Sequence, residues 1–176
     1  EYLIKNGVDV VITREPGGTR IGEQVRELLL QVRQEKMSTI TELLLIFAAR
    51  AQHIFEFIEP NLAAGKWVLC DRFTDATYAY QCGGRGVEWD KIRKLEKLVQ
   101  GELHPDYTIL LDVSVDVGMA RASGRGNLDR FERETLEFFE RVRLSYLQQA
   151  KNSSGRYRLI DASVSLDEVQ QELLKF

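Results

Sequence analysis

Four short runs of apolar residues recur along the chain and predict β-strands. The runs cover residues 8–13, 67–71, 107–113 and 156–161. Their apolar residues are nearly continuous rather than alternating with polar ones, which is typical of strands buried on both faces of a parallel sheet. We therefore expect four strands in the interior of the protein.

Segments with a helical spacing of apolar residues separate these strands. They cover residues 21–32, 41–62, 89–100, 115–122, 133–150 and 166–176. We expect the second of them to bend near Pro60, and we interpret residues 1–5 as the last turns of another helix, capped by Gly7. Strands that alternate with helices indicate an α/β fold around a parallel sheet, in a single domain.

The overall composition is that of an ordinary globular protein, and it narrows the classes of partner. Hydrophobic residues make up 44% of the 176 residues, charged residues make up 29%, and the net charge is −3. A general nucleic-acid binder normally carries a basic surplus, so we expect no nucleic-acid partner. The longest apolar run, 43–49, is too short to span a bilayer, and residues 1–7 lack the pattern of a signal peptide. We expect a cytoplasmic protein without a membrane partner.

The cysteines and histidines do not form a recognisable metal-binding pattern. Cys70 ends a predicted strand and Cys82 lies in a glycine-rich loop, so we expect two reduced thiols rather than a disulfide. His53 and His104 are far apart and lack the spacing of metal ligands. We expect each histidine at the surface or at a helix cap.

Two charged motifs follow predicted strands, at the edge of the sheet where ligands bind. TREPGGT, residues 13–19, follows the first strand, and Asp71 and Arg72 end the second. Ligands of open parallel sheets lie at the carboxyl ends of the strands, and paired glycines let backbone N–H groups approach an anion. An aspartate in this position can hold Mg²⁺, and an adjacent arginine can hold a phosphate. The alternative is that each motif forms only an exposed ion pair at an ordinary turn.

Two further patterns fit a nucleotide ligand. A glycine-containing segment carries several arginines, as expected of a lid that closes over polyphosphate. These arginines are Arg121, Arg125, Arg130 and Arg133. Phe47 and Arg50 lie three residues apart on one helix face, where an aromatic ring and a guanidinium could clamp a planar base. The alternatives are an exposed basic connection and a phenylalanine of the core.

In their order and spacing, six segments resemble the thymidylate kinase family over essentially the whole chain. They are TREPGGT, EQVRELLL, ELLLIFAARAQH, DRFTDATYAYQCGGRG, HPDYTILLDV and RASGRGNLDRFE. The resemblance, to the bacterial type with arginines in the lid, implies a P-loop kinase that transfers the γ-phosphoryl group of ATP to dTMP with Mg²⁺. It also implies a homodimer. The alternatives are a kinase for another nucleoside monophosphate or a deoxynucleoside, and a non-catalytic nucleotide-binding module.

The resemblance also implies roles for individual residues. The dTMP phosphate would be held by Arg26 and Arg72, and the thymine by Phe47, Arg50, Thr77 and Gln81, with Tyr80 below the sugar. The residues expected to take part in catalysis are Glu15, Asp71, Arg72 and Arg125, of which Glu15 and Asp71 would lie near Mg²⁺. The residues expected to meet ATP in a lid at about 121–133 are Arg121, Arg125 and Arg130.

Three departures from the family pattern shape these expectations. The phosphate-binding GxxxxGK[ST] loop is absent from the sequence, and the resemblance places it before residue 1. We therefore expect residues 1–176 to be one N-terminally incomplete domain, without the first strand of a five-stranded parallel sheet of order 2-3-1-4-5. Ala76 stands where many members carry serine, and Ile46 stands where many carry the stacking aromatic residue.

Overall fold

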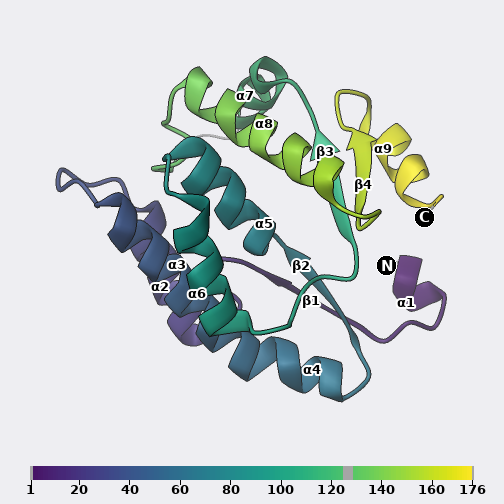
Figure 1. The fold of residues 1–176 in the computed structure, drawn as a ribbon. Helices are drawn as coiled ribbons and strands as arrows, with labels where there is room; N and C mark the ends of the chain where they lie inside the picture. Colours follow the sequence, from purple (N-terminus) through teal and green to yellow (C-terminus); the bar gives the residue numbers. More distant parts are fainter. Residues whose placement is uncertain (1, 125–128, 176) are drawn as a thin grey trace.

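A computed structural model describes residues 2–124 and 129–175, and its strands form two parallel pairs (Figure 1). β1 (Val10–Arg14) pairs with β2 (Trp67–Asp71), in a register that sets Arg14 opposite Asp71. β3 (Thr108–Asp112) pairs with β4 (Tyr157–Asp161), and Asp112 lies opposite Asp161. Each strand lies within two residues of its predicted bounds, and the prediction of parallel strands in an α/β fold is confirmed.

The prediction that the strands are buried on both faces is wrong for the described residues. Exposed and partly buried positions alternate along β2, where Trp67 is 57% and Leu69 is 49% exposed. Ile12 on β1 and Leu111 on β3 are exposed in the same way. The reason is that the described helices cover one face of each pair and leave apolar side chains of the other face uncovered.

The helices follow the predicted order, with one further helix after β2. The α-helices are α1 (Tyr2–Lys5), α2 (Arg20–Leu30), α3 (Thr39–His53), α4 (Glu59–Ala63), α5 (Thr74–Thr77), α6 (Trp89–Gln100), α7 (Val115–Ser123), α8 (Leu136–Asn152) and α9 (Leu166–Leu173). Side-chain hydroxyls cap several of their amino ends, as in α2, where Thr19 accepts from the Gly22 N–H. Ser165 and Glu168 form a complete capping box at α9.

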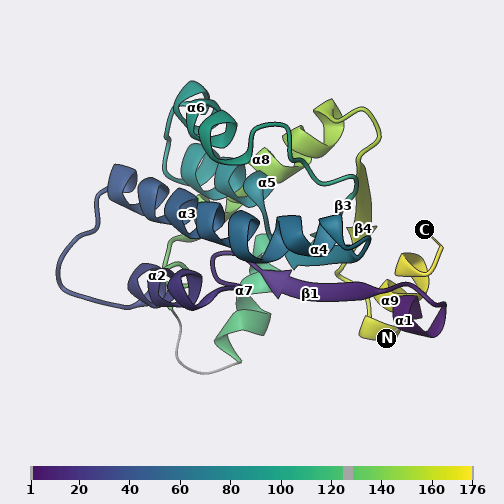
Figure 2. The same ribbon diagram turned by 90° about the horizontal axis from the view of Figure 1, so that it is seen from below.

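Two turns of π-helix interrupt the helical segments. η1 (Ile54–Ile58) joins α3 to α4, so the helix predicted over 41–62 is one helical run with a widened turn before Pro60 (Figure 2). Pro60 lies in the first turn of α4, where a missing N–H is tolerated. η2 (Tyr78–Gly84) continues α5. π-helical turns occur frequently at functional sites, and η2 contains the YAYQCGG stretch of the predicted base-binding site.

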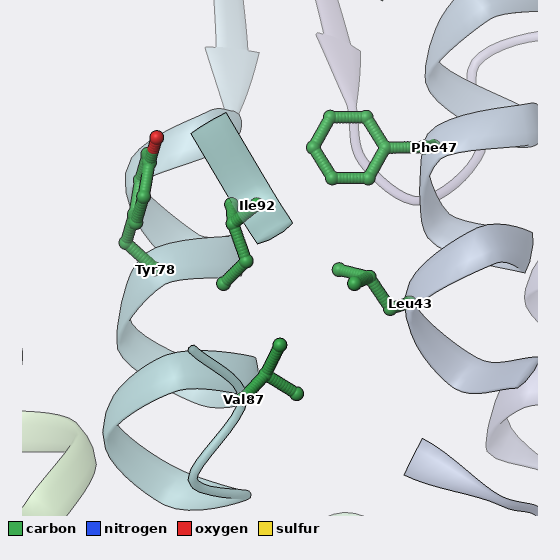
Figure 3. Packing of buried hydrophobic residues seen from close by; sticks show 5 residues of the cluster. All are labelled: Leu43, Phe47, Tyr78, Val87 and Ile92. Carbon is green, nitrogen blue, oxygen red and sulfur yellow. The ribbon is translucent and has the colours of Figure 1, made fainter. Parts of the chain in front are cut away.

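The larger hydrophobic core lies between α3, η2 and α6. Figure 3 shows Leu43 and Phe47 of α3 facing Tyr78, Val87 and Ile92 across this space. A second cluster joins η2 to α8 through Ala79, Phe138 and Val142. The apolar faces of α3 and α8 thus clamp η2 from two sides, and its side chains are held in place.

Helix α8 joins the strand pair β3–β4 to the helical segment that follows β2. It packs against η2 on one side and contacts β3 and β4 on the other (Figure 1). Arg143 of α8 donates two hydrogen bonds to Asp112 at the end of β3, at 2.7 and 2.9 Å. Within residues 2–124 and 129–175, no helix is both long enough and apolar enough to cross a membrane.

Candidate active site

A cavity of about 270 Å³ lies at the carboxyl ends of β1 and β2. Eight residues that the sequence assigned to dTMP or catalysis line it: Glu15, Arg26, Arg50, Asp71, Arg72, Thr77, Tyr80 and Gln81. They come from the turn after β1, from α2 and α3, and from the segment that runs from β2 through η2. The fold therefore brings together residues that are up to 66 positions apart in the sequence.

Glu15, in the turn after β1, is the centre of a buried charged cluster. Arg50 Nε donates to its Oε2 at 2.7 Å, and His53 Nδ1 lies 2.9 Å from its Oε1. The exposed fractions of Glu15, Arg50 and His53 are 4%, 2% and 0%. Both oxygens of Glu15 are therefore engaged by protein groups, and the carboxylate holds the Arg50 guanidinium in one orientation.

The expectation that His53 lies at the surface or caps a helix with its side chain is wrong, because His53 is the last residue of α3 but is fully buried and its side chain makes no capping hydrogen bond. Its Nε2 lies 2.7 Å from Thr13 Oγ1, so the imidazole bridges the end of β1 and the turn after it. Gly18 closes over the ring with φ 79°, and a Cβ there would meet His53 Nε2 at 2.5 Å. No local sequence pattern indicated this contact, because His53 lies 40 residues after Thr13. His104 is exposed, as predicted.

Arg50 lines the cavity and has one guanidinium nitrogen without a hydrogen-bonding partner among the described residues. Its Nη2 donates to Thr77 Oγ1 at 2.9 Å, whereas its buried Nη1 finds no acceptor among the described residues. The guanidinium lies between two aromatic rings, 5.0 Å from the centre of Phe47 and 5.1 Å from that of Phe73. A buried donor without a partner is costly, so Nη1 is placed to meet a ligand acceptor.

The structure places Phe47 differently from the predicted base stack. Phe47 belongs to the hydrophobic core and packs its ring against Arg50, while Ile46 and Phe73 line the cavity. The reason is the helical spacing: Ile46 shares a face of α3 with Arg50 at four residues, and Phe47 lies 100° further round. Phe73 was not predicted, because it follows the strand end rather than a helical pattern.

Two further arginines, Arg26 and Arg72, line the cavity from α2 and from the end of β2. Arg26 donates to the Pro16 carbonyl at 3.0 Å, and Arg72 stacks over the Tyr80 ring at 4.9 Å. Burial, and after it the positive charges of Arg14 and Arg72, lower the pKa of Arg26 below its ordinary value. Like charges held together in this way favour an anionic ligand, and two guanidiniums suit a phosphate.

The backbone at the end of β2 is unusual. Arg72 has φ 67°, the left-handed conformation that a non-glycine residue rarely adopts. Such conformations concentrate at ligand sites, where the surrounding structure over-determines them. Here the conformation follows directly on Asp71 and turns the chain into α5, so that Arg72 and Asp71 both line the cavity.

Asp71 is the carboxylate that fits a magnesium ion best. Among the described residues no group donates a hydrogen bond to its side chain, and it lines both the main cavity and a second one beside Arg14 and Glu23. No cluster of three or more potential ligand side chains occurs in residues 2–124 and 129–175. Mg²⁺ is commonly held by one or two carboxylates together with substrate phosphates and water, and this arrangement agrees with that pattern.

Arg14 and Glu23 stabilise the turn that carries Glu15. Arg14 donates to Glu23 Oε2 at 2.9 Å, and the Gly18 N–H donates to Glu23 Oε1 at 3.0 Å. The Arg14 guanidinium, and after it the Gly18 N–H, hold the pKa of Glu23 below its ordinary value. The exposed ion pair considered for this turn therefore exists, but it lies beside the buried cluster rather than replacing it.

Glu42 is a buried acidic residue that the sequence reasoning missed. It is 1% exposed, lies on α3, and accepts a hydrogen bond from Gln81 Nε2 at 3.0 Å. Arg85 and Arg130 also pair with its carboxylate, at 3.2 and 2.7 Å. The available signal was its spacing, because Glu42, Ile46 and Arg50 follow one another at four residues along one helix face.

The predicted lid arginines have separate positions. Arg121 on α7 donates to the carbonyls of Ala162 and Ser163. Arg130 pairs with Glu42 and donates from Nε to the Leu29 carbonyl at 2.7 Å. Arg125, the lid arginine assigned to catalysis, lies outside the described residues.

The lining of the cavity combines arginines with carboxylates and with the hydroxyl and amide groups of Thr77 and Gln81, which suits a nucleoside monophosphate. Its position at the carboxyl ends of parallel strands is the one that α/β nucleotide kinases use. The fold and the site thus define the class of nucleoside-monophosphate kinases.

Comparisons with known proteins identify the family within this class. The family model for thymidylate kinase matches residues 1–173. The thymidylate kinases of Pseudomonas putida and Ectopseudomonas mendocina are 58% and 57% identical to the chain, over 97% and 98% of it and 81% and 82% of their own length. A crystal structure of thymidylate kinase from Ehrlichia chaffeensis superposes with a TM-score of 0.75 at 34% identity, covering 95% of this chain and 79% of that one. The chain belongs to the thymidylate kinase family, whose members phosphorylate dTMP and share the P-loop nucleoside-monophosphate kinase fold.

Proposed function

We propose that the cavity binds dTMP with its phosphate at Arg26 and Arg72 and its thymine against Arg50, Thr77 and Gln81. The observation that carries the proposal is that the lining contains two kinds of group that a ligand would satisfy. The positive charges of Arg14 and Arg72 act on Arg26, so this arginine cluster favours an anion, and Arg50 Nη1 has no acceptor among the described residues. A phosphate and a thymine carbonyl supply these two groups, and the sugar between them lies against Tyr80.

The reaction joins the bound phosphate to the γ-phosphoryl group of ATP. An oxygen of the dTMP phosphate attacks the γ-phosphorus, the bond to the β–γ bridging oxygen breaks, and dTDP and ADP result. Arg72 and Arg26 neutralise and orient the attacking phosphate, which is the main task of a protein in phosphoryl transfer. Mg²⁺, when bound, would screen the charge of the ATP phosphates, and Asp71 would hold it directly or through water.

Glu15 acts on catalysis through Arg50 in this proposal. Direct ligation of Mg²⁺ by Glu15 fits poorly, because both of its oxygens are engaged by Arg50 and His53. Its carboxylate instead fixes the guanidinium that meets the base. The rings of Phe47 and Phe73 also contact the same guanidinium.

The ATP side of the site is proposed from the sequence. Arg121, Arg125 and Arg130 would contribute positive charge near ATP from a lid at about residues 121–133. Support comes from their position in the family pattern rather than from a described contact with the cavity, although neighbouring Asp129 and Phe131 line it.

We further propose that the two strand pairs belong to one five-stranded parallel sheet of order 2-3-1-4-5. In this order β1, β2, β3 and β4 are the second to fifth strands, and the first strand lies between β2 and β3. The support is that β2 and β3 each pair with one described strand only and carry exposed apolar side chains. A strand between them would complete the sheet and the domain. Exposed apolar residues on α3 and α6, among them Leu44 and Leu98, are compatible with a homodimer through helices.

A panel of acceptors tests the proposed function. Phosphoryl transfer from ATP would be measured with dTMP, dUMP, dCMP, AMP and thymidine, and the highest kcat/KM is expected for dTMP. Preference for dCMP or AMP would indicate a kinase for another nucleoside monophosphate, and transfer to thymidine alone would indicate a deoxynucleoside kinase. Tight dTMP binding without turnover in the full-length enzyme would indicate a non-catalytic module.

A further inference from the structure

The contacts of Gln81 fix the direction of its side-chain amide. Gln81 lines the cavity from η2 and is 2% exposed. Its Nε2 donates to Glu42 Oε1 at 3.0 Å. A carboxylate paired with two guanidiniums can only accept hydrogen bonds, so the NH₂ group of the amide must face Glu42. The amide oxygen, Oε1, is left for the cavity, and no group within residues 2–124 and 129–175 donates to it.

We infer that Glu42 is a positioning residue that makes Gln81 present a hydrogen-bond acceptor to the base. This inference rests on the proposed binding of dTMP in the cavity. Thymine carries a donor, N3–H, between its two carbonyl groups, whereas the corresponding nitrogen of cytosine is an acceptor. An amide oxygen held toward N3 therefore pairs with thymine and faces a lone pair of cytosine.

The surroundings of Glu42 keep its carboxylate in a single orientation. Arg85 Nε lies 3.2 Å from Oε1, and Arg130 lies 2.7 Å from Oε2. Arg85 also pairs with Glu134 at 2.6 Å, and Arg130 is held by the Leu29 carbonyl at 2.7 Å. Both oxygens of Glu42 are thus held by guanidinium groups, and the carboxylate cannot rotate without breaking these pairs.

Two carboxylates therefore orient the side chains that contact thymine in this proposal. On α3, Glu42 lies about two helical turns before Arg50 on the same helix face, and Ile46 and Arg50 of that face line the cavity. Glu15 orients Arg50 as a donor, and Glu42 orients Gln81 as an acceptor. Discrimination between thymine and cytosine then depends on a residue that does not touch the base.

The test uses the ratio of kcat/KM for dTMP to that for dCMP in the full-length enzyme. Glu42→Met removes the acceptor with little change in side-chain length, so Gln81 can turn either end of its amide to the base. The ratio is expected to fall about tenfold or more, since an unpaired or wrongly paired polar group in a buried site costs that much. In the double variant with Gln81→Met, the ratio is expected to fall no further than in either single variant.

A purely structural role of Glu42 would give a different result. Glu134→Gln removes another carboxylate from the same arginine cluster and does not contact Gln81, so it is expected to lower stability and leave the ratio unchanged. If Glu42→Met lowers kcat/KM equally for both nucleotides, or if the effects of the two methionine variants on the ratio simply multiply, the inference is wrong.

An exchange of the two groups covers the case in which Glu42→Met does not fold. In E42Q/Q81E, the amide of residue 42 donates to the carboxylate of residue 81, and a free carboxylate oxygen faces N3. Q81E alone sets two carboxylates against each other and is expected to lose dTMP activity, which the double exchange recovers together with the ratio. No recovery would overturn the inference. If the wild-type enzyme itself does not prefer dTMP to dCMP, the proposed function is wrong.

Discussion

Glu15 shows how the role of a side chain depends on residues that the fold brings from elsewhere. Its position at a strand end, in TREPGGT, suggested a carboxylate near Mg²⁺. In the structure it lies between Arg50 and His53 in a site that is almost entirely buried. A buried ion pair of this kind is weak evidence for stability by itself, but the removal of one partner leaves an uncompensated charge.

Glu15→Gln is therefore expected to affect both stability and acceptor binding. The free energy of unfolding should fall by roughly 3 kcal/mol, because Arg50 stays buried without its counter-charge. The KM for dTMP should rise more than kcat falls, because Arg50 loses its fixed orientation. Urea denaturation and steady-state kinetics measure the two effects.

Glu88→Gln is the matched control for this substitution. Glu88 pairs with Lys91 at 2.8 Å, but both side chains are more than half exposed. Such pairs contribute little, so no resolvable change in stability or in the KM for dTMP is expected. Equal effects of the two substitutions would contradict the assignment of a positioning role to Glu15.

At the scale of elements, the contact between η2 and α8 holds the residues that we propose to contact the base and the sugar. Gly84 lies against the ring of Phe138, and a Cβ at Gly84 would overlap that ring. Gly83 lies against Ser145 and the Arg141 carbonyl, and Arg141 donates to the Gly84 carbonyl at 3.0 Å. The two glycines thus permit a close approach that places Tyr80 and Gln81 at the cavity.

Gly84→Ala should force η2 and α8 apart. Overpacking of this kind typically costs about 1–3 kcal/mol, and the KM for dTMP should rise as Gln81 moves. Thermal denaturation and kinetics provide the measurement. The control is Gly118→Ala on α7, where the nearest atom to a new Cβ is Val113 Cγ1 at 3.6 Å and where alanine favours the helix. A Gly84→Ala protein as stable as Gly118→Ala would contradict the proposed role of the contact.

Local sequence patterns predicted some of the elements and could not predict others. The strands and the helix at Trp89–Gln100 were predicted closely, because continuous apolar runs and helical spacing are local properties. The π-helical turns were not, since they depend on the packing of η2 between α3 and α8. His53, Glu42 and Phe73 were missed at the site for a related reason: each obtains its role from a partner that is distant in sequence. The uncovered faces of the strands likewise depend on tertiary packing.

For the whole molecule, stability at acidic pH depends in part on the ion pair between Arg143 of α8 and Asp112 of β3. Hydrogen bonds from Arg143 hold the pKa of Asp112 below its ordinary value of 3.8. The bond therefore stabilises the fold fully above about pH 4, and its contribution is lost as the pH falls through the lower pKa of the folded protein.

Asp112→Asn should reveal this pH dependence directly. The variant is expected to melt at a lower temperature than the wild type at neutral pH, and the difference should shrink below pH 4. Melting curves across this range provide the test. A difference that stays constant down to pH 2 would show that Asp112 does not contribute through its charge.

The central claim at this scale is that the cavity is a binding site for the phosphate and base of dTMP. Calorimetric titration of the wild-type protein with dTMP and with thymidine tests it without requiring turnover. Two arginines on the phosphate predict an affinity for dTMP that exceeds that for thymidine by roughly 100-fold or more, and Arg72→Ala should remove most of this difference. Equal affinities for the two ligands, or a difference that survives in Arg72→Ala, would contradict the account.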